Sequence, residues 1–265
     1  MTRLLDSLYS ALPMFSRKKN GADSVAMFHT GRCGSTVLGQ MLDQHSMIKW
    51  AGEIFEEYTQ DANSGAMSTA LVERTINSNR GKNDSGIFGF ETKYLPKQHL
   101  SDKCINMELA NYIELLRRIH FGKFIILDRK NYLRRFISAR VGVQTSSWHS
   151  KKEAQAPTKV SLNVRSFGIT QQPILESFET LDRMLMDVRR ALEQYDTLLL
   201  NYEDDILIDP KIGYRKVCDF LQLADEDPKI KYARTNPFKC KEIINNYDEV
   251  EKILKNTRYS WMLDN

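Results

Sequence analysis

Short apolar runs alternate along the chain with longer amphipathic stretches. The runs have the length of buried strands and lie at residues 24–28, 87–90, 124–127 and 197–202. Between and after them, apolar residues recur every three or four positions, which predicts helices at 36–44, 107–120, 132–141, 171–194, 212–221 and 241–254. Strands that alternate with helices are typical of a parallel sheet. The pattern therefore predicts an α/β fold of three layers, with a central, mainly parallel sheet flanked by helices.

Two polar stretches interrupt this alternation, and we expect both to be excursions from the fold. They span residues 61–85 and 144–168. The second is a candidate lid because it carries four cations, Lys151, Lys152, Lys159 and Arg165. No linker rich in Pro or Gly divides the chain. We therefore expect a basic amphipathic leader at 1–20 and one domain at 21–265.

Charge and composition narrow the class of protein. The chain has 265 residues, 42% of them hydrophobic, and a formal net charge of +4. The leader contributes +3 of this charge, from Arg3, Arg17, Lys18 and Lys19 against Asp6. A body that is almost neutral argues against nucleic-acid binding, which needs a large basic surface. The apolar runs are also far shorter than the roughly 20 residues of a transmembrane helix.

The leader does not resemble a secretory signal, because polar residues interrupt its apolar positions. It is either a frayed helix or a helix with weak contact to a membrane surface or a partner. The four cysteines, Cys33, Cys104, Cys218 and Cys240, lie far apart without a CxxC pair. We therefore expect reduced thiols, no zinc site and a cytoplasmic location. The oligomeric state stays open.

The segment 25–36 predicts a binding site for an anion. A buried strand runs into a turn that contains Gly31 and Gly34, where the backbone can bend and approach a ligand. A helix then begins, and its first N–H groups and its dipole favour negative charge. Arg32 adds a cation, and Ser35 and Thr36 add hydroxyl donors. The alternative is an ordinary glycine-rich turn with a serine cap.

This turn is P-loop-like but is not a Walker A loop. When Gly34, Ser35 and Thr36 are aligned on the Walker ending, Ser35 stands where the loop needs lysine, and His29 replaces the first glycine. A kinase or ATPase that uses Mg-nucleotide is therefore disfavoured.

A second anion signature follows the third strand. Arg129 comes directly after the strand, where α/β sheets bind ligands, and Ser138 lies two turns along the next helix. The spacing places Ser138 on the helix face of Arg134 or Arg135. The alternative is a basic helix that faces solvent.

Together these segments resemble the sulfotransferases that use 3′-phosphoadenosine-5′-phosphosulfate (PAPS). Thr30-Gly31-Arg32-Cys33-Gly34-Ser35-Thr36 is similar to the family's 5′-phosphosulfate loop, and Arg129 with Ser138 to its 3′-phosphate motif. The segment 198–205 is similar to the family's late strand with its Tyr-Glu-Asp step. The resemblance covers about residues 24–263 and is nearest to the bacterial carbohydrate branch, which includes enzymes like trehalose sulfotransferase.

The resemblance implies the site residues as well as the reaction. Thr30, Gly31, Arg32, Cys33, Gly34, Ser35 and Thr36 would hold the phosphosulfate, and Arg129 and Ser138 the 3′-phosphate. The usual spacing of eight to Ser138 fits Lys130 instead of Arg129, so the choice between these two stays open. The catalytic groups would be Arg32 and, as the base, Glu53, which matches a Gly-Glu step of the carbohydrate branch.

Other groups compete for the role of base or play supporting parts. His45 and His99 are alternative bases, because histidine serves in other branches of the family. Trp50 and Phe55 are candidates for an apolar wall beside Glu53. Lys93 can reach the cleft or stay in solvent, and we expect His29 to point into the sheet. Glu203 and Asp204 are expected to brace the core beneath the site.

We thus expect transfer of a sulfuryl group from PAPS, without a metal, to a hydroxyl of a carbohydrate, glycolipid or small metabolite. Sulfuryl transfer needs positioning, neutralisation of charge on the oxygens and a base. Two other classes remain, a small-molecule kinase and a nucleotide-binding module without turnover.

Overall fold

A computed structural model describes residues 24–60, 65–81, 86–95, 97–152, 154–233 and 236–264. The predicted leader at 1–20 lies outside these residues. Their centre is a parallel sheet of five strands in the order β2-β3-β1-β4-β5. The bounds are β1 Ser24–His29, β2 Ile48–Trp50, β3 Ile87–Lys93, β4 Lys123–Asp128 and β5 Asp196–Asn201. The predicted fold class is confirmed.

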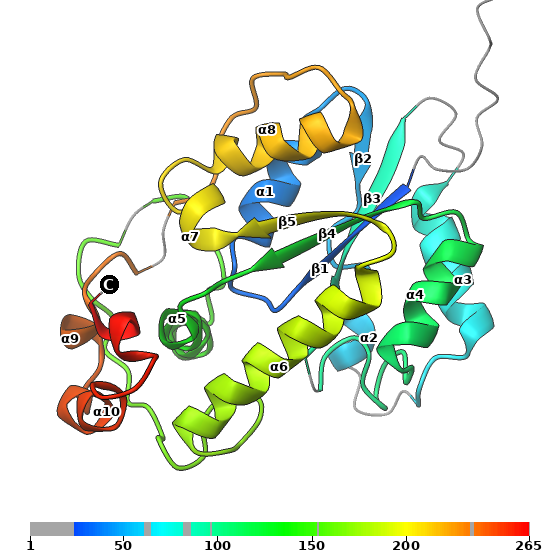
Figure 1. Ribbon diagram of the computed structural model, residues 1–265. Coiled ribbons are helices and arrows are strands. Elements are labelled where there is room, and N and C mark those ends of the chain that lie inside the picture. The colour runs from blue at the N-terminus through cyan, green and yellow to red at the C-terminus, as the bar shows by residue number, and fades with distance from the viewer. Residues whose placement is uncertain are drawn as a thin grey trace, which may run out of the picture.

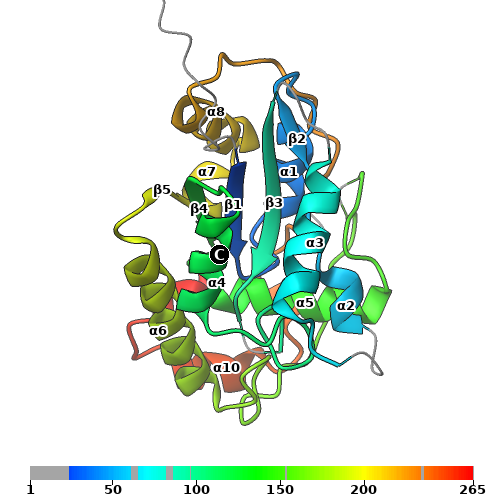
Figure 2. The ribbon, with the colours of Figure 1, turned by 90° about the vertical axis from the view of Figure 1, so that its right-hand side faces the viewer.

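Helices cover both faces of this sheet (Figure 1). One face carries α1 Ser35–Leu42 and α8 Pro210–Leu221, and the other carries α3 Thr69–Arg80, α4 Leu109–Arg118 and α6 Ile174–Leu192. The long helix α5 Tyr132–Thr145 runs across the carboxyl ends of the strands (Figure 2). The remaining elements are α2 Glu56–Gln60, α7 Tyr202–Asp205, α9 Cys240–Ile243, α10 Tyr247–Leu254 and a 3₁₀ turn, Ser260–Leu263.

Strand alternation divides the apolar core into two layers. Val25 and Met27 of β1 face α1 and α8. Ala26 and Phe28 face the larger aromatic core on the side of α4 and α6. Strand β1 is fully buried because β3 and β4 pair with it on either side. This arrangement fixes the loop that follows β1 in the middle of the sheet.

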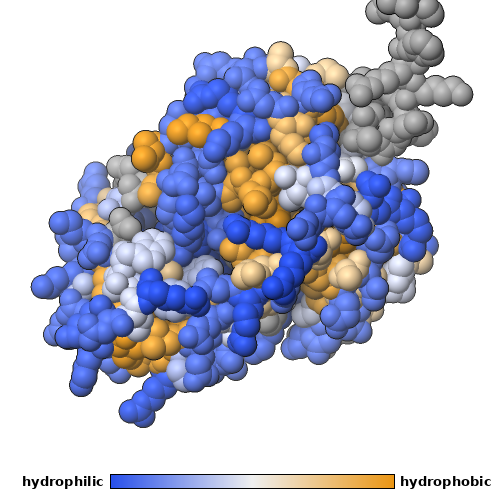
Figure 3. Space-filling model, in the orientation of Figure 1, coloured by the Kyte–Doolittle hydropathy of each residue, from blue (hydrophilic) through white to orange (hydrophobic). Residues whose placement is uncertain are grey.

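Edge strand β5 is less well covered than the others. Leu199 keeps 51% of its surface exposed. Figure 3 shows apolar surface in this region, over β5 and beside α8. No helix within the described residues is long and apolar enough to cross a membrane.

Two sequence predictions about elements need correction, and one strand was missed. The polar stretch 61–85 contains α3, because Val72 and Ile76 bury one face of an otherwise polar helix. The expected helix at 241–254 is divided into α9 and α10 around residues 244–246. The strand β2 was not predicted, since three residues are too few for a recognisable apolar run.

Candidate functional site

The loop after β1 has the backbone of an anion cradle. Gly31, Arg32 and Gly34 have positive φ angles of 75°, 56° and 85°. A Cβ added at Gly34 would lie 2.6 Å from Ile206 Cγ2, so the position also needs glycine for space. Helix α1 begins directly after this turn. Its first N–H groups and its dipole therefore favour an anion in the turn.

The loop lies at the point in the sheet where the connections that follow two neighbouring strands run in opposite directions. Strands β1 and β4 are neighbours, yet the chain leaves β1 towards β2 and leaves β4 towards β5, on the opposite side. In open α/β sheets, ligands bind in the crevice at such a point. The turns after β1 and β4 both open into one cleft here, with a volume of about 1490 Å³.

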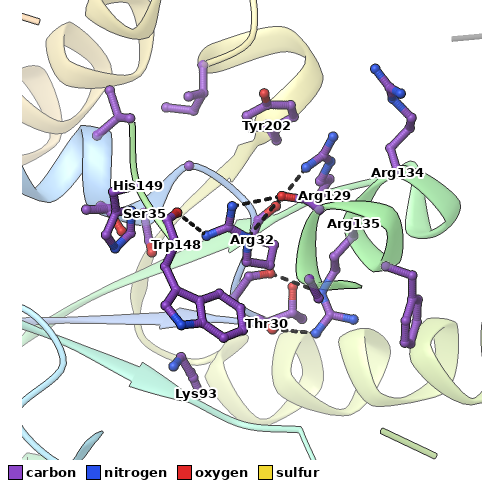
Figure 4. Close-up of a pocket in the computed structure, with 18 of the residues that line it drawn as sticks. Thr30, Arg32, Ser35, Lys93, Arg129, Arg134, Arg135, Trp148, His149 and Tyr202 are labelled. Atoms are coloured by element: carbon purple, nitrogen blue, oxygen red, sulfur yellow. Dashed lines mark hydrogen bonds between the residues drawn. The ribbon is translucent and has the colours of Figure 1, made fainter. Parts of the chain in front are cut away.

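Arg32 and Ser138 meet in this cleft, although they are far apart in sequence. Arg32 Nε and Nη2 donate to Ser138 Oγ at 3.0 and 2.9 Å. Its Nη1 donates to the backbone oxygen of Trp148 at 2.8 Å, as Figure 4 shows. The structure thus joins the two predicted anion signatures through the contact between Arg32 and Ser138.

Arg129 and Lys130 point in different directions. Arg129 Nη1 donates to the carbonyl oxygen of Arg32 at 2.9 Å, and its guanidinium lies 4.2 Å from the ring centroid of Tyr202. Lys130 is half exposed and donates instead to Asp204 Oδ2 at 2.7 Å. Only Arg129 of the two lines the cleft. Glu203 braces this turn by accepting the N–H of Lys130 at 2.9 Å.

Sequence reasoning did not identify the cation that holds the loop from behind. Arg135 is buried, and its Nε and Nη2 donate to the carbonyl oxygens of Gly31 and Thr30 at 3.0 and 2.5 Å (Figure 4). The sequence signal was an arginine pair, Arg134-Arg135, at apolar positions of a helix. It does not show which backbone groups each arginine meets.

Glu53 lines the same cleft within a cluster of charged groups. The ammonium of Lys93 bridges Glu53 and Glu56, and its distance to Glu56 Oε2 is 2.7 Å. Burial raises the pKa of Glu53 to about 7, despite the opposing effect of Lys93. The contact with His99 holds the pKa of Glu56 well below its usual range. Glu53 therefore exchanges a proton near neutral pH, whereas Glu56 stays ionised.

Behind this cluster lies a fully buried pair on β1 and β3. His29 Nδ1 accepts the N–H of Gly31 at 3.1 Å, so a neutral His29 carries its proton on Nε2. That atom lies 3.4 Å from Glu91 Oε2 and 3.7 Å from Glu53 Oε1. Glu91 also accepts from Trp50 Nε1 at 2.9 Å, and burial raises its pKa. His29 points into the sheet, as predicted.

The other two histidines considered as bases lie away from the cleft. His45 Nε2 is 2.9 Å from the carbonyl oxygen of Ala224, under the loop after α8. His99 is completely buried, and its Nδ1 accepts the N–H of Lys93 at 3.0 Å. Neither residue lines the cleft. In this structure Glu53 is better placed than either histidine to reach an acceptor.

One further expectation about a side chain was wrong, and the structure shows where another side chain lies. Phe55 is fully buried in the aromatic core and forms no wall beside Glu53, whereas Trp50 does line the cleft. Cys33 also faces the interior, and burial raises the pKa of its thiol to about 12. Only its backbone remains a candidate ligand for the donor.

The candidate lid contributes to the cleft through residues other than its cations. Trp148, Ser161, Asn163 and Phe167 line the cleft. Lys151, Lys152, Lys159 and Arg165 do not line it. The segment thus offers aromatic and neutral polar groups to a ligand, together with the imidazole of His149, which also lines the cleft.

Two groups of side chains have atoms close enough to surround a metal ion, namely His29, Glu53 and Glu91, and Glu53, Glu56 and His99. The hydrogen bond from Gly31 leaves the proton of His29 on the nitrogen that would have to bind the metal. Lys93 already supplies a positive charge to both Glu53 and Glu56. The contacts therefore fit ion pairing better than metal binding.

Comparison with known proteins supports the fold assignment. No protein-family model matches the chain. No curated protein matches it either. Among solved structures, the crystal structure of a sulfotransferase from Alicyclobacillus acidocaldarius is similar at 14% sequence identity and a TM-score of 0.50. The similarity covers 86% of this chain and 90% of that one. At this identity the likeness concerns the fold.

Proposed function

We propose that the protein is a sulfotransferase that moves a sulfuryl group from PAPS to a hydroxyl of an acceptor. The observation that carries this proposal is the meeting of Arg32, Arg129 and Ser138 in one cleft that also contains Glu53. Cations, backbone N–H groups and a base are the parts that sulfuryl transfer needs. The fold of a bacterial sulfotransferase supports the same conclusion.

The loop and its surroundings fit the donor. Thr30, Gly31, Arg32, Gly34, Ser35 and Thr36 line the cleft and would hold the phosphosulfate, together with the backbone of Cys33. Arg129 and Ser138 would hold the 3′-phosphate. Two buried polar atoms beside the loop, Arg129 Nε and Thr30 Oγ1, have no hydrogen-bond partner among the described residues. Glu203 Oε1 lies 4.0 Å from Arg129 Nε, which is beyond hydrogen-bond distance. Because buried donors normally find partners, both atoms can donate to an anionic ligand.

In the proposed reaction, Glu53 takes the proton of the acceptor hydroxyl as the acceptor oxygen attacks sulfur. The new O–S bond forms while the bond from sulfur to the 5′-phosphate oxygen breaks, and 3′,5′-ADP leaves. Arg32 would stabilise the charge that develops on the leaving oxygens. A pKa of about 7 suits Glu53 to act as a base near neutral pH.

We propose a carbohydrate, glycolipid or small metabolite as the acceptor. The cleft of about 1490 Å³ exceeds the roughly 300–1,000 Å³ of most small-molecule sites and leaves room for an acceptor beside the donor. Trp148 and Tyr232 offer aromatic faces, and Ser161 and Asn163 offer polar groups. The nearly neutral charge of residues 21–265 favours a small acceptor over a nucleic acid.

A thermal-shift experiment with 3′,5′-ADP tests this function. A ligand that binds only the folded protein raises the melting temperature by mass action. We expect 3′,5′-ADP to do so without added Mg²⁺, and ATP to do so much less because it has no 3′-phosphate. Equal stabilisation by ATP, or strict dependence on Mg²⁺, would favour the kinase instead.

A further inference from the structure

Arg135 is a buried cation whose hydrogen bonds go to the anion loop. It lies on α5 and donates to the carbonyl oxygens of Thr30 and Gly31, two consecutive peptide groups. No carboxylate within the described chain forms an ion pair with it. A buried charge is costly without a counter-charge, so its position needs an explanation.

These bonds determine how the loop presents its N–H groups. A peptide group is planar and trans, so a carbonyl that points to Arg135 turns the next N–H in the opposite direction. The N–H of Gly31 indeed points the other way and donates to His29 Nδ1 at 3.1 Å. The same geometry at the next peptide turns the N–H of Arg32 away from Arg135.

We propose that Arg135 is a positioning residue that orients the loop for the donor anion. This inference rests on the proposed function only in taking the loop as the site of the phosphosulfate. Arg135 holds two carbonyl oxygens away from the anion, which they would repel. His29 holds the first of these two peptide groups from the other side, because it accepts the N–H of Gly31. The bound anion also adds negative charge near Arg135, which forms no ion pair with the carboxylates of the described residues.

The neighbouring arginine provides a matched control. Arg134 is also buried on α5, but its Nη1 donates to the carbonyl oxygen of Phe238 at 2.6 Å, in the C-terminal region. Substitution by lysine keeps the charge at either position and removes the forked geometry. A lysine at position 135 has a single ammonium group, so it can donate to one loop carbonyl but cannot hold both carbonyls as the two arginine nitrogens do.

The test compares Arg135→Lys and Arg134→Lys by calorimetric titration with 3′,5′-ADP and with inorganic pyrophosphate. For Arg135→Lys we expect both ligands to bind at least about tenfold more weakly, the loss expected for one charge-assisted hydrogen bond. With PAPS as donor, the KM for PAPS should rise while the KM for the acceptor stays unchanged. Arg134→Lys should bind both ligands within about threefold of the wild type, a change of less than 1 kcal/mol.

Each outcome separates the inference from the proposed function. If the wild type and Arg135→Lys bind 3′,5′-ADP equally well, the inference about Arg135 is wrong and the proposed function stands. If the wild type binds pyrophosphate but not 3′,5′-ADP, the proposed donor is wrong. The titration with pyrophosphate then still tests the role of Arg135. Binding of neither ligand overturns both. If Arg135→Lys does not fold, Arg135→Ala is titrated in the presence of guanidinium, which can replace the missing side-chain group. If guanidinium does not restore ligand binding to the folded Arg135→Ala variant, the inference is wrong.

Discussion

Replacement of Glu53 by glutamine tests the assignment of the base. Glutamine has nearly the same shape and can still accept a hydrogen bond from Lys93, but it cannot take a proton. If Glu53 deprotonates the acceptor, kcat should fall by about 10²–10⁴-fold, the usual contribution of general base catalysis. Affinity for 3′,5′-ADP should change little, because the proposed phosphate ligands Arg32, Ser35 and Arg129 are unchanged.

The pH dependence follows from the environment of Glu53. Burial favours the neutral carboxyl and raises its pKa to about 7. The ionised, active fraction should then rise from about one-tenth at pH 6 to about nine-tenths at pH 8. The kcat/KM for the acceptor should therefore increase about tenfold over this interval, and the residual activity of Glu53→Gln should lack this rise.

The assay is release of 3′,5′-ADP from PAPS at a saturating donor concentration, measured between pH 5.5 and 8.5. His45→Gln serves as the comparison, since His45 contacts the carbonyl oxygen of Ala224 and does not line the cleft. A Glu53→Gln enzyme with near-normal turnover and an unchanged pH profile would refute the assignment.

Four further substitutions test separate parts of the site. Arg129→Ala should weaken the binding of 3′,5′-ADP by roughly 1.5–3 kcal/mol in a calorimetric titration. Lys130→Ala should have a small effect on this binding, because Lys130 contacts Asp204. If Lys130→Ala weakened binding more than Arg129→Ala, the 3′-phosphate would be assigned to Lys130. Gly34→Ala should lower the free energy of unfolding, measured with urea, by about 1–3 kcal/mol. The φ angle of Gly34 is 85°, and the new Cβ would collide with Ile206. An unchanged free energy of unfolding would show that alanine is not strained at this position. Glu91→Gln should change the free energy of unfolding by less than about 1 kcal/mol. Burial disfavours the charged carboxyl and raises its pKa, and the glutamine oxygen can still accept from Trp50 Nε1. A loss of several kcal/mol would contradict this reasoning.

Local patterns were sufficient to predict four of the five strands and the glycine turn after β1. Strands β1, β3, β4 and β5 have apolar runs that stand out from their polar surroundings. The turn after β1 combines two glycines with an arginine and hydroxyl residues at the start of a helix. These features depend on neighbours in the chain, so the sequence alone predicts them.

The contacts across the cleft could not be predicted in the same way. The bonds of Arg135 to the loop join residues 104 and 105 positions apart. The link between Lys93 and Glu56 spans 37 positions and depends on how α2 packs beside β3. Residue types showed that cations and acids were available near the strand ends. The fold decided which of them face the ligand.

The most direct test of the central claim is sulfuryl transfer itself. The purified protein is incubated with PAPS carrying a labelled sulfuryl group and with a panel of sugars, glycolipids and small hydroxylated metabolites. We predict a labelled, sulfated product with at least one acceptor and release of 3′,5′-ADP in equal amount. The absence of transfer to any acceptor, together with the absence of 3′,5′-ADP binding, would contradict the proposed function.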